Sequence, residues 1–287
     1  MSRAPGPRHP APGADPAGEL RLASLAVNTP GVLHAEIDGH PATVDQLLLP
    51  ATVNYGHVTT MQVRNRRVRG LAAHLDRLDA ANRELFGTGL DGDLVRRRVR
   101  HALAARHDAT VRVSAFQPED APTSSLLVTV RPPADPPSAP RRLRSVRYQR
   151  PLPHLKHVGT FAQLHHGRQA RQDGFDDALL VGQDDLVTEG TVSNIGFLAG
   201  TEVRWPEAPA LAGVTEGLLV AGLTARGVPQ HRRPVRLADL PGLSAAFVTN
   251  SRGVSPVSQI DDHHFPVDPD LMRTLHHTYA SVPWDRL

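Results

Sequence analysis

Lys156 is the only lysine in the sequence, although the chain holds 32 Lys and Arg residues in all. An arginine side chain stays protonated beyond about pH 12 and offers no free amine, whereas a lysine amine can lose its proton and attack a carbonyl carbon. A single lysine among so many arginines indicates either a task that arginine cannot perform or the remainder of a compositional bias. The residues around Lys156 decide between these interpretations.

Two segments downstream of Lys156 place polar groups in apolar surroundings. In the first, Glu189 is followed by Gly-Thr-Val-Ser-Asn-Ile; in the second, Gly213 precedes Val214 and Thr215 where a helix is expected to begin. Free backbone N–H groups at a helix start suit a phosphate. Pyridoxal phosphate needs an amine for a Schiff base, a carboxylate to keep its ring nitrogen protonated, and amides for its phosphate. The three segments therefore predict a pyridoxal-phosphate cofactor.

At these residues the chain resembles the class IV (fold type IV) pyridoxal-phosphate enzymes, which include branched-chain and D-amino-acid aminotransferases and aminodeoxychorismate lyase. The resemblance extends from Leu33 to the C-terminus. It rests on five matches in the family's order, which are HLDRL at 74–78, Lys156, EGTVSNI at 189–195, GVT at 213–215, and TNS at 249–251 followed by Pro256-Val257. Several separate matches in order carry more weight than any one of them.

The resemblance implies a role for each matched residue. Lys156 would form the Schiff base and move the substrate proton, Glu189 would bind the ring nitrogen, and Arg77 would reach the phosphate. The remaining cofactor-binding candidates are Val214, Thr215, Ser193, Asn194 and Asn250, and the substrate candidates are Tyr55, Thr60 and His157.

Structural alternatives stay open for these residues. Glu189 is also compatible with a capping carboxylate, Arg77 with a surface pair to Asp76 or Glu84, and Thr215 with an ordinary helix cap. The position of Asn250 and Ser251 relative to Pro256 leaves their register open, and Tyr55 and Thr60 are equally compatible with core packing.

The sequence has features of two reactions that occur in the family. Glu189-Gly190 with Ser193-Asn194 resembles the aminotransferases, which favours transfer of an amino group between an amino acid or amine and a keto acid. Lys156-His157 and Thr59-Thr60 are more similar to the lyase, which eliminates pyruvate to give an aminobenzoate. Two departures are Phe161, where many transaminases carry Tyr, and Glu216, whose charge would repel a phosphate unless it turns away. A cofactor-free binding module on the same scaffold is the alternative of another class.

Composition excludes several further functions. The chain has no cysteine, which excludes disulfides and thiolate chemistry, and no apolar stretch long enough for a signal peptide or membrane span. Its net charge of +3 and its unclustered arginines do not favour nucleic acid. The histidine doublets lack the spacing of a zinc site. We expect no metal, a cytoplasmic homodimer, and small amino and keto acids as partners.

Periodicity predicts an α+β fold in two parts. Residues 1–30 read as a disordered tail, 31–131 as an N-terminal α+β domain, 132–140 as a proline-rich linker, and 141–287 as the larger cofactor-binding domain with a barrel-like sheet, as the resemblance implies. The expected helices span 71–87, 91–106, 161–173, 215–226 and 269–281. The expected strands span 33–37, 42–44, 58–63, 66–69, 110–116, 125–130, 143–148, 177–181, 186–188, 195–198 and 245–249.

Overall fold

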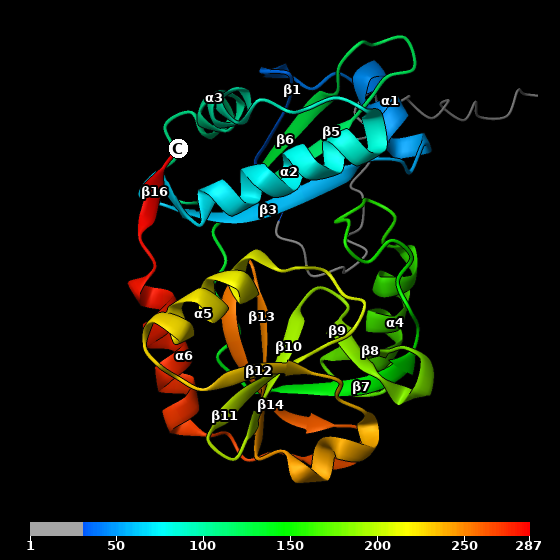
Figure 1. Cartoon of the computed structure of the whole chain (residues 1–287). Coiled ribbons are helices and arrows are strands. Elements are labelled where there is room, and N and C mark those ends of the chain that lie inside the picture. The colour runs from blue at the N-terminus through cyan, green and yellow to red at the C-terminus, as the bar shows by residue number, and fades with distance from the viewer. Residues whose placement is uncertain (1–30) are drawn as a thin grey trace, which may run out of the picture. The chain divides into compact units, whose positions relative to one another are not determined.

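The computed structural model describes residues 31–287, and the predicted tail at residues 1–30 lies outside the described residues. Within the described part the strands form two sheets that are accompanied by helices (Figure 1). The first sheet is antiparallel, in the order β16-β4-β3-β5-β6-β1-β2. Its strands are β1 (His34–Ile37), β2 (His40–Pro41), β3 (His57–Arg64), β4 (Arg67–Arg69), β5 (Ala109–Phe116), β6 (Ser125–Arg131) and β16 (Trp284–Arg286).

The first sheet has one apolar and one polar face because its strands alternate. On β5, Val111 and Val113 are fully buried, whereas Arg112 between them points to the other side. The apolar face packs against α2 (Leu71–Phe86) and α3 (Gly92–Leu103), whose buried side chains complete this core. The opposite face is therefore left for polar side chains, and it faces the site described below.

The second sheet is mixed and curls around a second core. Its order is β12-β11-β10-β13-β14-β7-β8-β9, with β15 paired to β14. Its strands are β7 (Arg141–Arg147), β8 (Asp177–Val181), β9 (Val187–Gly190), β10 (Asn194–Ala199), β11 (Glu202–Pro206), β12 (Gln230–Arg233), β13 (Ala245–Asn250), β14 (Gly253–Ile260) and β15 (His263–His264). Leu179, Ile195, Phe197 and Val257 are among the side chains that fill the curl.

Three helices cover the second sheet. α4 (Phe161–Gln172) packs on β7 and β8, while α5 (Val214–Ala225) and α6 (Pro269–Ser281) pack on each other and on β13 and β14. A third cluster, with Trp205, Phe247 and Leu275 at its centre, lies between these two helices and the sheet. This packing fixes the start of α5 beside the end of β13.

The expected mixture of helices and strands, with a curled second sheet, is confirmed. The two helices predicted in the first part, α2 and α3, and the three predicted in the second part form where the periodicity places them. The proposed division at 132–140 stays a prediction; residues 284–286 pair with the first sheet, so the chain returns to it after α6.

The strand predicted at 42–44 is wrong. Asp38 (φ 51°) and Gly39 (φ 81°) make the expected turn, but β2 ends at Pro41 and α1 (Val44–Thr52) follows. Thr43 and Gln46 form a capping box that starts this helix, which hydrophobic periodicity did not predict. Strands β11, β12, β14, β15 and β16 were not predicted either. In β14, Pro256 cannot donate to a strand ladder, which disfavours a strand in that segment.

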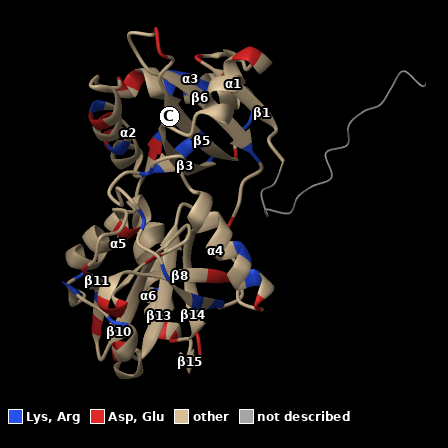
Figure 2. Cartoon of the chain, turned by 90° about the vertical axis from the view of Figure 1, so that its right-hand side faces the viewer, with Lys and Arg blue, Asp and Glu red and all other residues tan. Residues whose placement is uncertain are grey.

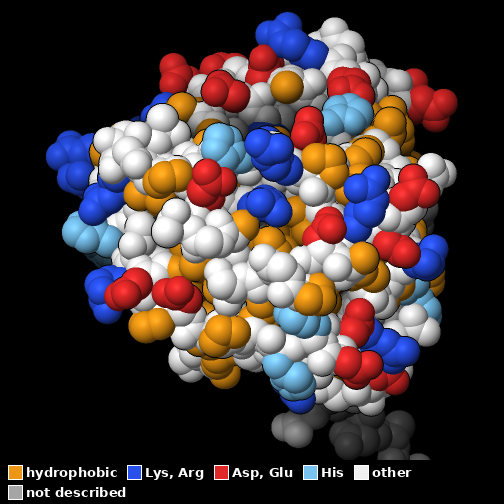
Figure 3. Space-filling model, turned by 60° about the horizontal axis from the view of Figure 1, so that its bottom comes forward, with side chains coloured by type: hydrophobic (Ala, Val, Ile, Leu, Met, Phe, Trp, Pro, Cys, Tyr) orange, Lys and Arg blue, Asp and Glu red, His pale blue; other side chains and the backbone are white. Residues whose placement is uncertain are grey.

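Charges of both signs are interspersed along the ribbon in the view of Figure 2, and the face in Figure 3 mixes hydrophobic, basic and acidic side chains. None of the helices within residues 31–287 combines the length and apolar character that crossing a membrane requires. The expected cytoplasmic location stays a prediction.

Candidate active site

Lys156 lies in the loop between β7 and α4, and this loop is paired with the start of β3. The backbone carbonyl of Lys156 accepts a hydrogen bond from the Val58 N–H at 2.8 Å, and the Val158 N–H donates to the Gly56 carbonyl at 2.9 Å. A side chain at Gly56 would place its Cβ 2.5 Å from the Ala115 carbonyl oxygen, so glycine permits the close approach of this segment to β5. The lysine is thereby fixed between the two sheets.

The amine of Lys156 lies among several cations. Burial, followed by the positive charges of Arg77, Arg150 and Arg112, lowers the pKa of Lys156 to about 7, and Glu189 partly opposes this shift. An amine with such a pKa is largely unprotonated just above neutral pH, which makes it available as a nucleophile or a base. The structure thus gives the single lysine the property that arginine lacks.

Glu189 is buried at the end of β9, and Arg150 is its main partner. Arg150 Nε donates to Glu189 Oε1 at 3.0 Å, and the Leu211 N–H donates to Oε2 at 3.3 Å. Burial raises the pKa of Glu189, whereas Arg150 and the Leu211 N–H act in the opposite direction. Arg150 therefore supplies a cation for this buried carboxylate from within the chain.

Arg77 projects from α2 into a buried cluster with Thr59 and His74, and it does not pair with Asp76 or Glu84. Arg77 Nη2 donates to the Thr59 hydroxyl, which lies 2.7 Å from His74 Nδ1. Burial, together with the charges of Arg77 and Lys156, lowers the pKa of His74 to about 3. The imidazole is therefore neutral, and its Nδ1, which lies 3.3 Å from the donor Arg77 Nη2, is positioned as a hydrogen-bond acceptor. Arg77 Nε stays buried without a hydrogen-bond partner among the described residues.

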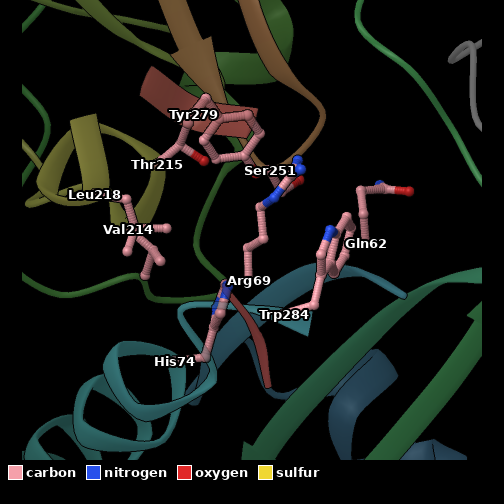
Figure 4. Close-up of a pocket in the computed structure, with 9 residues that line it drawn as sticks. All are labelled: Gln62, Arg69, His74, Val214, Thr215, Leu218, Ser251, Tyr279 and Trp284. Carbon is pink, nitrogen blue, oxygen red and sulfur yellow. The ribbon is translucent and has the colours of Figure 1, made fainter. Parts of the chain in front are cut away.

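The first turn of α5 presents backbone N–H groups without a side-chain cap. The cap residue is Gly213, and the first N–H groups of any helix lack intrahelical partners. The hydroxyl of Thr215 is directed to the Asn250 carbonyl at 2.7 Å, so Thr215 ties the helix start to the end of β13. Val214 and Thr215 also line a small cavity with His74 and Ser251 (Figure 4). This helix start can accept an anion.

Ser193 and Asn194 shape the loops around Glu189. Asn194 Nδ2 donates to the Leu211 carbonyl at 2.7 Å, and a Cβ at Gly213 would lie 1.9 Å from Asn194 Oδ1. The Gly190 N–H donates to the Ser193 carbonyl at 2.7 Å. In this structure their contacts are with the loop backbone, which positions Glu189 and the start of α5.

Glu216 is paired at the start of α5. Its buried carboxylate pairs with Arg232 on β12 and receives the Gly213 N–H. Burial raises the pKa of Glu216, and Arg232 opposes this. Arg232 thus compensates the negative charge that was expected to repel a phosphate.

The substrate candidates are held in different ways. The Tyr55 hydroxyl donates to the Leu85 carbonyl at 3.4 Å and its ring packs edge-on against Phe86, so Tyr55 lies at the end of α2. Thr60 stands opposite Arg112 in the sheet register. The His157 ring nitrogen Nε2 lies 3.1 Å from the Pro151 carbonyl, and burial lowers the pKa of His157.

Phe161 begins α4 with 79% of its surface exposed, so it does not enter the site. Within residues 31–287 no group of three or more acidic, histidine or cysteine side chains is arranged to hold a metal.

Sequence reasoning missed Arg150 and Arg112. Arg150 looked like one more loop arginine before a proline, and only a buried anion nearby would have singled it out. Arg112 sits in an alternating strand, where a charged residue usually faces solvent. Here it is largely buried on the polar face of the first sheet and acts on Lys156. The only hydrogen bond of its side chain within the described residues is from Nε to the Ser114 hydroxyl, at 3.4 Å.

Comparison with known families accounts for this arrangement. The amino-transferase class IV family matches residues 56–260. The chain belongs to the class IV aminotransferase family. The match includes all the residues that surround Lys156, from β3 to β14, so the family is shown by the same part of the chain that builds the site.

Solved structures of class IV aminotransferases and their relatives share the fold. A 4-amino-4-deoxychorismate lyase from Pseudomonas aeruginosa is 25% identical, with a TM-score of 0.70 over 85% of this chain and 97% of that one. A branched-chain aminotransferase from Thermoproteus uzoniensis is 19% identical, with a TM-score of 0.73 over 86% and 94%. A fold IV transaminase from Curtobacterium pusillum is 23% identical, with a TM-score of 0.72 over 81% and 88%. Comparison with curated proteins finds no match.

Proposed function

We propose that this class IV enzyme uses pyridoxal phosphate to transfer an amino group between an amino acid or amine and a keto acid, with Lys156 as the catalytic residue. The observation that carries the proposal is the position of Lys156. Its amine has a pKa of about 7 and lies within electrostatic reach of Glu189 and Arg77. An amine, a buried carboxylate and an anion site are thus brought together from separate parts of the chain.

The residues fit the cofactor in three respects. Arg77 has a buried Nε without a partner among the described residues, and the start of α5 has uncapped N–H groups, which together suit a phosphate. Glu189 holds two donors, and a carboxylate has room for more, so it can still accept a ring N–H. Relatives of the same fold from Mycobacterium tuberculosis are described in a PLP-bound form and in a form with alpha-ketoglutarate and PMP.

Each residue then has a task. When bound, pyridoxal phosphate supplies an aldehyde carbon for the amine and an acceptor for the electrons released at the substrate Cα. Lys156 Nζ would hold the cofactor covalently, and once free it would take the proton from the substrate Cα and return it to the aldehyde carbon of the cofactor. Arg77 and the N–H groups of Val214 and Thr215 would hold the phosphate. Glu189 would bind the ring nitrogen, and Arg150 favours the charged form of this carboxylate.

Arg112 supports a substrate that carries a carboxylate. It is partly buried, its charge acts on Lys156, and Arg131 lies on the neighbouring strand. Neither arginine has an acidic partner within residues 31–287. Burying unpaired cations is costly, so an anionic ligand would relieve the cost. Thr60, opposite Arg112, would line the same part of the site.

The proposed enzyme is a homodimer, as the family resemblance implies. None of the residues of α1 is buried, although the helix carries Val44 and a run of three leucines. Val44 is 76% exposed and Leu48 is 54% exposed. An apolar helix face of this kind is usually covered by another chain.

The direct test combines absorbance with reductive labelling. Purified protein with pyridoxal phosphate should show a visible band that moves when an amino donor is added, and borohydride should fix the cofactor on Lys156, which mass spectrometry would detect. A panel of L- and D-amino acids with a keto acid acceptor then measures transfer. A protein that stays colourless and takes up no pyridoxal phosphate would refute the proposal and leave the cofactor-free binding module.

Aminodeoxychorismate lyase activity is the second candidate. It is favoured by Phe161, which stands where many transaminases carry a Tyr and so lacks that hydroxyl, and by the likeness to two lyase structures. The same Lys156 amine would take the α-proton before pyruvate leaves. Release of pyruvate from aminodeoxychorismate without amino transfer would make this the function and overturn the first choice.

A further inference from the structure

The segment that follows α6 is built into the edge of the first sheet. β16 pairs antiparallel with β4, so that Trp284 stands opposite Arg69. The side chain of Leu287 enters the core of the first sheet, and its N–H donates to the Arg66 carbonyl at 3.4 Å. Figure 1 shows β16 in red beside the first sheet, after the last helix of the second. One short segment thus joins the helices of both sheets.

Arg69 holds this segment through two aromatic rings. Its guanidinium carbon lies 4.2 Å from the centre of the Trp284 ring and 4.8 Å from that of Tyr279. Its Nη2 also donates to the Ala280 carbonyl at 3.3 Å. Figure 4 shows the three side chains around the small cavity that Val214 and Thr215 line. The stack therefore lies next to the start of α5.

The start of α2 depends on the same segment. The residue before this helix is Gly70, in a left-handed conformation (φ 66°), and it has no side chain to cap the free N–H groups. Asp285 replaces the missing cap, since its Oδ2 accepts the Leu71 N–H at 2.9 Å. A side chain at Gly70 would place its Cβ 2.8 Å from Leu218 Cδ1, so α2 also packs closely against α5.

These contacts connect the two helices that would bind a phosphate. α2 carries Arg77 less than two turns after Leu71, and α5 begins with Val214 and Thr215. A carboxylate also stabilises the positive end of a helix dipole, so Asp285 favours the position of α2 in two ways. The hydrogen bond of Asp285 is to the Leu71 N–H at the start of α2. Its effect on the site therefore passes through α2.

We propose that Asp285 is a positioning residue for the phosphate of the cofactor, because it fixes α2, and with it Arg77, against the start of α5. The inference rests on the proposed function. It identifies the segment 284–287, together with the stack of Arg69 on its two aromatic rings, as the part that holds Arg77 and the start of α5 in place around the phosphate. A residue of merely structural importance would lower stability without changing which ligand groups are recognised.

The test compares two ligands that differ only in the phosphate. The full chain, freed of cofactor, is titrated with pyridoxal phosphate and with pyridoxal, and the visible absorbance gives both dissociation constants. We expect Asp285→Ala to raise the dissociation constant of pyridoxal phosphate about tenfold, as loss of a charge-assisted contact would. The dissociation constant of pyridoxal should not change. Asp285→Asn keeps an acceptor oxygen for the Leu71 N–H and should restore most of the affinity.

Asp91→Ala is the matched control. Asp91 caps α3 through the Asp93 N–H at 2.8 Å, and α3 carries none of the candidate site residues. This variant should lose a similar amount of stability and keep both dissociation constants. In an Arg77→Ala background, Asp285→Ala should no longer discriminate between the ligands, because its effect passes through Arg77.

The outcomes separate the two proposals. The positioning role is wrong if Asp285→Ala weakens the binding of both ligands equally or of neither. It is also wrong if the variant still weakens pyridoxal phosphate binding in the Arg77→Ala background. In these cases the proposed function stands. If the unchanged protein does not prefer pyridoxal phosphate to pyridoxal, the proposed phosphate site is wrong and the positioning role falls with it.

Discussion

Arg150 joins Glu189 to the loop of Lys156. Its Nε donates to the Glu189 carboxylate at 3.0 Å, and its Nη1 donates at 2.8 Å to the carbonyl of Leu155, the residue before Lys156. One buried guanidinium therefore balances the carboxylate that is expected to face the cofactor ring and fixes the backbone beside the amine. This links the electrostatics of the site to its geometry.

Replacing Arg150 should therefore disturb both the charge balance of Glu189 and the position of the Lys156 backbone. Arg150→Ala leaves Glu189 buried without a cation, which we expect to cost about 3 to 5 kcal/mol of unfolding free energy at neutral pH. Denaturant unfolding measures this. The double variant Arg150→Ala/Glu189→Gln should recover much of the loss, because no unpaired charge remains. If Arg150→Ala lowered the unfolding free energy equally with Glu189 and with Glu189→Gln, the ion pair with Glu189 would not be the source of the stability that Arg150 provides.

The reactivity of Lys156 should depend on pH with a midpoint near 7. Because the pKa of Lys156 is lowered to about 7, its neutral amine increases as the pH rises through this value. Borohydride trapping of pyridoxal phosphate on the protein, followed by mass spectrometry, should give that midpoint. Lys156→Arg keeps the charge and should abolish the covalent link. A midpoint near 10, the range of an exposed lysine, would contradict the surroundings described here.

The lowered pKa of Lys156 also predicts how the unfolding free energy depends on pH. Between about pH 7 and the ordinary value of 10.5, the unfolded chain binds a proton at Lys156 that the folded protein does not. The unfolding free energy of the cofactor-free protein should therefore rise with pH across this window. In Lys156→Met this contribution should disappear, which chemical denaturation at several pH values would reveal.

Arg112 should determine affinity for the acid group of the substrate. Arg112→Ala should raise KM for a keto acid by about tenfold or more, since a charge-assisted hydrogen bond contributes roughly 1.5 to 3 kcal/mol. It should have little effect on an amine donor without a carboxylate. Steady-state kinetics on both kinds of substrate provide the comparison, with Thr129→Val, at the neighbouring register position, as a control. Equal losses on both would exclude a carboxylate contact.

The exposed face of α1 should mediate association of two chains. Leu48→Asp places a charge on this face and should shift the protein from dimer to monomer in light scattering coupled to gel filtration. Val267→Asp alters another exposed apolar residue, before α6, and should leave the dimer intact. A monomer in the unchanged protein would refute the proposed assembly.

Much of this protein could be predicted from local patterns. Helical periodicity located α2, α3, α4, α5 and α6, and alternation located β3, β5 and β6, because side-chain period depends on neighbouring residues alone. The uniqueness of Lys156 and the ordered motifs around Glu189 and Gly213 led to the family, which the comparisons confirm. The roles of the individual site residues stay predictions, although the structure brings Lys156, Glu189 and Arg77 together.

Only the tertiary structure decided the surroundings of those residues. The sequence alone determined that one amine, one carboxylate and one helix start were available, since residue type and order are local properties. It did not determine that Arg150 pairs with Glu189, that Arg112 turns toward Lys156, or that Asp285 caps a helix more than 200 residues earlier. Such contacts depend on how distant segments pack, and a charge shifts the pKa of another group only at the distance that packing sets.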